Sequence, residues 1–142
     1  MSRENNGNVK KVLNQYKKIR WMIDDLDTQI DDVTKNMSSL KSGKLTGMPR
    51  GGVPVTYADL IADKDELERR KKRYEVVAKQ KKEIVQTYID TVLSVKHNRL
   101  LTLYYVKCMP MQAVAKKEHY TERHAFRVYT EALDMVDLTL DL

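Results

Sequence analysis

Apolar residues recur in alternating steps of three and four along the first forty positions of the chain. The series comprises Val9, Val12, Tyr16, Ile19, Ile23, Leu26, Ile30, Val33, Met37 and Leu40. This spacing is typical of a coiled-coil seam, in which the first and fourth positions of each heptad face a partner. It predicts a helix over residues 8–41, ~50 Å long, preceded by a loose polar segment. Because so narrow a stripe cannot be buried by its own helix, this helix needs a partner.

A second apolar stripe begins after Thr56, whose hydroxyl is suited to cap a helix. Its members are Tyr57, Leu60, Leu67, Tyr74, Ala78, Val85, Tyr88, Val92 and Val95, with Lys64, Lys71 and Lys81 as polar interruptions. Between the two stripes, residues 42–54 contain four glycines and two prolines, a composition typical of a loop. The pattern therefore predicts two long helices joined by a loop at 42–55, an antiparallel hairpin over residues 1–95.

Charge along the two predicted helices supports their pairing. If the chain folds back near Met48 and Pro49, residues whose numbers add to about 97 face each other. The aspartates between Asp24 and Asp32 then lie opposite the basic run 69–73. Such exposed pairs contribute about 0.5 kcal/mol each, so they set the register more than the stability. The basic run has a second interpretation as a nucleic-acid patch, and the two helices can pair within one chain or between two.

Residues 111–133 predict two short helices separated by a tight turn. The first has an apolar face at residues 113–115, and the pattern breaks at His119 and Tyr120. Thr121 can cap the second helix through its hydroxyl. Spacings of three and four give that second helix a narrow apolar back, formed by Ala125, Val128, Ala132 and Leu133. Its front carries cationic and hydrogen-bonding groups, which a helix that reads the DNA major groove requires.

A longer motif runs from the end of the predicted hairpin through these two helices. Its residues are Arg99, Leu100, Leu101, Leu103, Tyr104, Tyr105, Met109–Pro110, Val114–Ala115, Thr121 and Ala132–Leu133. This motif resembles region four of bacterial sigma factors, which is a helix-turn-helix unit. His119 takes the turn position that glycine often holds in that family, so the turn needs a left-handed backbone at a non-glycine residue. In size and layout the chain is similar to small phage regulators of the RinA and ArpU type, which implies activation of late or packaging genes.

We therefore predict an all-α protein with a helical hairpin at 1–95 and a C-terminal helix-turn-helix DNA-binding domain at 96–142. The residues expected to contact DNA are Lys116, Lys117, Thr121, Glu122, Arg123, His124, Phe126, Arg127 and Thr130. The two lysines are expected to meet the phosphate backbone. Base edges or nearby phosphates are expected to be met by five of the others: Thr121, Glu122, Arg123, Phe126 and Arg127. A basic cluster at the open end of the hairpin is either a further phosphate contact or a solvated face: Lys10, Lys11, Lys17, Lys18, Arg20, Lys79, Lys81 and Lys82.

Composition sets outer limits on the function. The chain has 142 residues, of which 42% are hydrophobic and 32% charged, and a net charge of +6. This balance suits a soluble helical protein and permits a polyanionic partner without requiring one. Cys108 is the single cysteine, which fits a reducing cytoplasm, here that of a bacterial host. No run approaches ~18 apolar residues, so no membrane span is expected. The tail from Asp134 is expected to pack on the base of the hairpin or to offer a protein contact.

The sequence offers no catalytic constellation. His97, His119 and His124 lack further metal ligands at suitable spacing, and no nucleophile–base pair, phosphate loop or dinucleotide motif occurs. We therefore expect no enzyme activity, metal or cofactor. The expected partners are double-stranded DNA, RNA polymerase and a second copy of the chain as a dimer. Two alternatives are a ring-forming DNA-packaging subunit of the small-terminase type and a coiled-coil adaptor with purely structural C-terminal helices.

Overall fold

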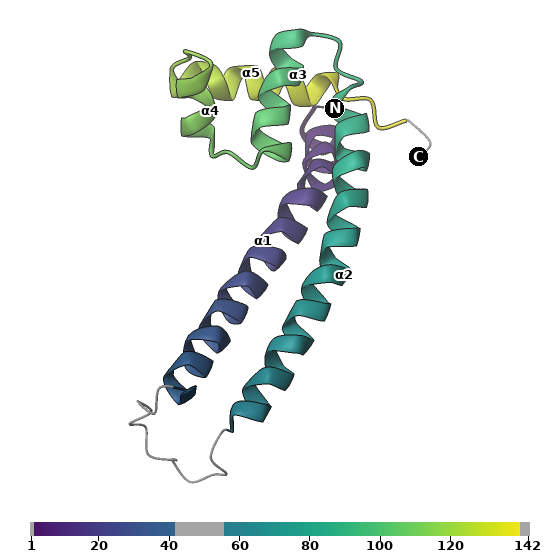
Figure 1. Cartoon of the computed structure of the whole chain (residues 1–142). Coiled ribbons are helices and arrows are strands. Elements are labelled where there is room, and N and C mark those ends of the chain that lie inside the picture. The colour runs from purple at the N-terminus through teal and green to yellow at the C-terminus, as the bar shows by residue number, and fades with distance from the viewer. Residues whose placement is uncertain (1, 42–55, 140–142) are drawn as a thin grey trace. The chain divides into compact units, whose positions relative to one another are not determined.

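The computed structural model describes residues 2–41 and 56–139, and its regular structure within those ranges is entirely helical (Figure 1). The elements are α1 (Ser2–Lys41), α2 (Tyr57–Ile89), α3 (Val95–Leu101), the π-helical turn η1 (Thr102–Val106), α4 (Met111–Lys117) and α5 (Glu122–Met135). The predicted all-α class is thus confirmed. The predicted loop at 42–55 lies outside the described residues.

Helix α1 begins at Ser2, six residues earlier than the apolar seam predicted. Val9, the first residue of the predicted seam, is fully buried. Extending a helix that has already formed costs little per residue, so α1 can begin before the seam does. The prediction of a loose segment at 1–7 is therefore wrong for residues 2–7.

Helices α1 and α2 pack together as an antiparallel pair with the predicted register. The ammonium of Lys71 lies 2.5 Å from a carboxylate oxygen of Asp27, and that of Lys81 donates a hydrogen bond to Gln15 Oε1 over 2.9 Å. The residue numbers of these two pairs add to 98 and 96, close to the predicted 97. At the start of α2, Thr56 and Asp59 each accept a hydrogen bond from the other's backbone N–H over 3.1 Å. The predicted cap at Thr56 is confirmed as a reciprocal capping box.

The chain forms two compact units. One consists of Met1–Arg20 with Val77–Leu142, and the other of Trp21–Val76. The second unit is a stretch of paired helices in which Ile23, Leu26 and Leu60 are buried. The predicted boundary between residues 95 and 96 separates two continuous segments of the chain, whereas these two units are defined by contacts between residues. That boundary therefore stays a prediction.

Helix α2 ends at Ile89, six residues before the end of its predicted stripe. Val95, predicted to lie in that stripe, instead begins α3 and is 77% exposed. The side chain of Asn98 explains the break, because its amide donates to the carbonyl oxygens of Ile89 and Val92, each over 3.2 Å. It thereby binds the carbonyl of the last residue of α2 and one in the turn that follows, which holds the chain where the helix ends.

The first unit has a core to which both long helices and the C-terminal helices contribute. Its buried members are Val9, Leu13, Val85, Ile89, Val92, Leu101, Tyr105, Val106, Ala132, Leu133 and Val136. Leu13 is fully buried although it lies outside the predicted seam. The first turns of α1 face both α2 and α5, so they need a wider apolar face than a two-helix seam provides. The beginning of the predicted tail also joins this core through Val136 and Leu138.

Candidate functional site

Helices α4 and α5 are joined by a tight turn whose backbone follows the sequence prediction. His119 has a φ of 61°, the left-handed conformation expected at this non-glycine position. The N–H of Tyr120 closes the turn by donating to the carbonyl of Ala115 over 2.8 Å. Thr121 then caps α5, because its hydroxyl oxygen accepts a hydrogen bond from the N–H of His124 over 3.1 Å. The turn and the cap together fix the direction in which α5 leaves α4.

The back of α5 is buried as its apolar spacing predicted. Its four predicted back residues are all at most 1% exposed: Ala125, Val128, Ala132 and Leu133. Ala125 and Val128 belong to a second core cluster together with Leu100, Leu103, Met111, Val114 and Ala115. Helix α5 is therefore held by α3, η1 and α4 on one side and by the core of both long helices on the other. Its side chains on the opposite face have fixed positions relative to the rest of the unit.

The front of α5 carries most of the predicted site residues. Glu122, Arg123, Phe126, Arg127 and Thr130 are all exposed, and Phe126 is 51% exposed. Neither arginine forms a hydrogen bond or ion pair with a residue that the structure describes. The remaining candidates Lys116, Lys117 and Thr121 are exposed at the adjoining end of α4 and in the turn. The arginines are four residues apart, which places both on one strip of the helix surface.

His124 is less accessible than its neighbours on α5. Its ring lies edge-on to that of Tyr120 with 4.8 Å between ring centroids, and the residue is half-buried. This contact packs the first turn of α5 against the turn that precedes it. His124 is thus placed to support the exposed strip rather than to stand at its centre.

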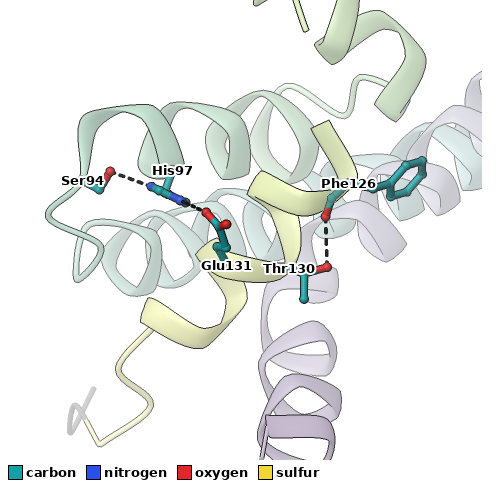
Figure 2. A network of polar contacts seen from close by, with 5 residues as sticks. All are labelled: Ser94, His97, Phe126, Thr130 and Glu131. Atoms are coloured by element: carbon teal, nitrogen blue, oxygen red, sulfur yellow. Dashed lines mark hydrogen bonds and ion pairs between the residues drawn. The ribbon is translucent and has the colours of Figure 1, made fainter. Parts of the chain in front are cut away.

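Two carboxylates close to this surface are already paired. Glu131 lies four residues after Arg127 in the chain, and its Oε2 is 2.9 Å from His97 Nε2. The other ring nitrogen of His97, Nδ1, is 2.6 Å from Ser94 Oγ (Figure 2). The hydrogen bond from His97 holds the pKa of Glu131 below its usual range. Glu118, next to Lys117, lies 2.6 Å from the guanidinium of Arg99. Both acids have a partner on α3, and the charge of Arg127 also contributes to the low pKa of Glu131. The sequence shows neither pairing, because the partners are 34 and 19 residues apart.

The first turns of α1 flank α5 through an aromatic cluster formed by Tyr104, Tyr105 and Tyr129. The ammonium of Lys17 lies 3.4 Å from the centroid of the Tyr104 ring, and that of Lys10 lies 5.9 Å from the Tyr129 ring. Burial lowers the pKa of Lys17. Lys17 therefore interacts with aromatic rings. The sequence instead places it in the basic cluster that is interpreted as a phosphate contact or a solvated face.

The hydroxyls of Tyr105 and Tyr129 lie 2.6 Å apart within this cluster. Burial raises the pKa of both phenols, and for Tyr105 the hydrogen bond to Tyr129 raises it further. The two side chains connect η1 to α5 across 24 residues of chain. The aromatic motif seen in the sequence thus serves to join the elements of the first unit.

Charge is divided unevenly between the two units. The first unit contains 16 Lys and Arg against nine Asp and Glu, a net charge of +7 at neutral pH, whereas the second contains ten against eleven. Within the predicted basic cluster the exposed members are Lys10, Lys11, Lys18, Lys79 and Lys82. Lys81 is half-buried and bound to Gln15. The positive charge of the protein is therefore carried by the unit that contains α4 and α5.

The described residues contain no group of three or more His, Cys, Asp or Glu side chains arranged to hold a metal ion. None of the helices in this part of the chain combines the length and the apolar character that crossing a bilayer demands.

Comparison with known families places the chain in one of them. It belongs to the family described as "Protein of unknown function (DUF1492)", whose model matches residues 36–137. The matched range contains the whole of α2 to α5 and thus every candidate site residue. No curated protein and no solved structure matches the chain.

Proposed function

We propose that this protein is a sequence-specific DNA-binding regulator of transcription that inserts α5 into the major groove. The observation that carries the proposal is the position of Arg123 and Arg127 on α5. Both project from a helix whose opposite face is fully buried, and neither forms a hydrogen bond or salt bridge with a described residue. An arginine that is exposed and held by a rigid helix can form two hydrogen bonds to a guanine edge.

The surroundings of α5 support this proposal. Lys116 and Lys117 are exposed on α4, which in a helix-turn-helix crosses the DNA backbone. Glu118 is paired with the guanidinium of Arg99, so its repulsion of phosphate is reduced, and Glu131 is held against α3 by its hydrogen bond with His97. The net charge of +7 on the unit favours approach to a polyanion. Asp134 shares the exposed strip, but it lies seven residues beyond Arg127, roughly 10 Å along the helix axis.

The proposal includes the resemblance to sigma region four and to the RinA and ArpU regulators. In this reading α4, the turn at His119 and α5 form a helix-turn-helix, and the target is a promoter of phage late or packaging genes in a bacterial cytoplasm. The paired long helices would contact RNA polymerase or a second copy of the chain. A dimer would double the short stretch of DNA that one such unit can read. The protein would act by binding, without enzyme activity.

Selection of bound sequences from random duplex DNA tests the proposal directly. We expect a defined site containing guanine, and we expect Arg123→Ala or Arg127→Ala to reduce the preference for that guanine by roughly 1–3 kcal/mol. Arg73→Ala is the matched control, because Arg73 is exposed on the second unit. Failure to enrich any sequence, together with no gel shift at micromolar protein and low salt, would overturn the proposal in favour of an adaptor. A light-scattering mass of eight or more copies would favour DNA packaging.

A further inference from the structure

The exposed surface of α5 contains an apolar row beside the two arginines. Phe126 and Thr130 are four residues apart, which aligns them along the helix. Both are exposed, and Phe126 belongs to neither core cluster. Figure 2 shows Phe126 on the opposite side of α5 from Glu131, which points towards His97. The ring is therefore presented outward and contributes little to packing within the unit.

Thr130 has no proton left to offer to an external group. Its hydroxyl donates a hydrogen bond to the backbone carbonyl of Phe126 over 3.0 Å (Figure 2). The phenyl ring of Phe126 has no hydrogen-bond donor either. The row formed by these two residues therefore presents carbon atoms and a hydroxyl that can only accept.

The adjacent row has the opposite chemistry. Arg123 and Arg127 carry five N–H donors each and no acceptor. Two parallel rows on one helix surface thus differ in what they can recognise. In the major groove, guanine offers two acceptors to an arginine, and thymine offers the one apolar group on a base edge, its C5 methyl. An apolar row without donors distinguishes bases by that methyl group.

We propose that Phe126 and Thr130 read thymine methyl groups at positions next to the guanines contacted by Arg123 and Arg127. This inference rests on the proposed function, and it means that the same surface of α5 recognises thymine in addition to guanine. Contact with the ring removes the methyl from water, and the hydrophobic gain is that of about one carbon. The recognised site therefore contains thymine at fixed positions, and at these positions uracil is the weaker ligand.

The test uses the full-length protein and the duplex obtained by selection from random DNA. Each thymine of that duplex is replaced in turn by deoxyuridine, which removes one methyl and keeps every base pair. We expect a loss of affinity of about fourfold at one or two thymines in the wild-type protein. Phe126→Ala should bring the affinity ratio between the two duplexes to about one, and Phe126→Leu should keep part of it. The ratio is measured within each variant, so a general loss of binding does not affect it.

Met135→Ala is the matched control. Met135 is an exposed apolar residue of α5, 43% exposed, nine positions beyond Phe126. We expect this variant to discriminate thymine from uracil as the wild type does. Selected sites without a fixed thymine, equal binding of the thymine and uracil duplexes, or discrimination that persists in Phe126→Ala would each overturn the inference. These results leave specific DNA binding intact, whereas a protein that selects no sequence overturns the inference and the proposed function together.

Discussion

His97 Nε2 lies 2.9 Å from Glu131 Oε2, and the two residues are 34 positions apart in the chain. The other ring nitrogen of His97 lies 2.6 Å from Ser94 Oγ, just before α3. Since His97 is buried and Glu131 is exposed on α5, this contact attaches the C-terminal half of α5 to the start of α3. It fixes the orientation of the helix and at the same time gives a partner to Glu131, which lies one helical turn from Arg127.

Removal of the His97 ring should destabilise the protein. His97→Ala deletes a buried side chain and removes the hydrogen-bond partner of Ser94 and of Glu131. We therefore expect the free energy of unfolding to fall by about 1–3 kcal/mol. Urea unfolding followed by circular dichroism measures the change. His124→Ala is a matched comparison, because His124 is half-buried and contacts one ring. Equal losses in the two variants would contradict the special role of the His97 network.

The same contact predicts a dependence of stability on acid pH. The hydrogen bond from His97 lowers the pKa of Glu131 from its ordinary value of 4.5. A carboxylate whose pKa is depressed by folding stabilises the protein above its unfolded pKa and loses that contribution as the pH falls through its folded pKa. The stability difference between the wild type and Glu131→Gln should therefore be constant above pH 5 and shrink below about pH 4.5. A difference that does not change with pH down to 3 would show that the Glu131 charge contributes nothing to folding.

The buried tyrosine pair predicts the opposite behaviour at alkaline pH. The pKa of Tyr105 is raised from 10.0, chiefly by burial and then by its hydrogen bond to Tyr129. A raised pKa stabilises the folded state below the unfolded pKa, and this contribution is lost as the pH rises above it. We expect the urea midpoint of the wild type to fall above pH 10 more steeply than that of Tyr105→Phe. Tyr57→Phe, which alters a tyrosine that is 42% exposed, should follow the wild-type profile.

The left-handed residue in the α4–α5 turn predicts a stabilising substitution. His119 has a φ of 61° and is exposed, so its side chain adds backbone strain without contributing to the core. His119→Gly should raise the free energy of unfolding by about 0.5–1 kcal/mol, because glycine adopts this conformation without steric cost. His119→Ala retains the Cβ and should show no gain. A loss of stability in the glycine variant would mean that the imidazole has a stabilising role in the turn.

The lysines of α4 predict a change in the salt dependence of DNA binding. If Lys116 contacts a phosphate, Lys116→Ala should weaken all DNA sequences alike and reduce the slope of log K against log salt by about 0.9. Fluorescence anisotropy between 50 and 200 mM salt on a selected site and on a scrambled duplex measures both effects. Lys35→Ala is the control, because Lys35 is exposed on the second unit and lies outside the basic run 69–73. An unchanged slope in Lys116→Ala would remove this residue from the proposed interface.

Features that depend on neighbours within one or two helical turns could be read from the sequence: the caps at Thr56 and Thr121, the left-handed turn at His119 and the buried back of α5. The pairing register of α1 and α2 could also be read from it, because the two helices carry complementary charges about a single fold-back point. The assignment of DNA contacts to α5 is also a sequence-based prediction, and it remains one.

Tertiary structure decided the features that join residues far apart in the chain. The amide of Asn98 ends α2 at Ile89, nine residues earlier, where periodicity alone continued the helix to Val95. Leu13 is buried because the start of α1 has two neighbours, and Lys17 lies on Tyr104 rather than in solvent. Glu131 contacts His97 because α5 packs against α3, although the two residues are 34 positions apart. Periodicity reports only which face of a helix is apolar, whereas these contacts depend on which element packs against that face.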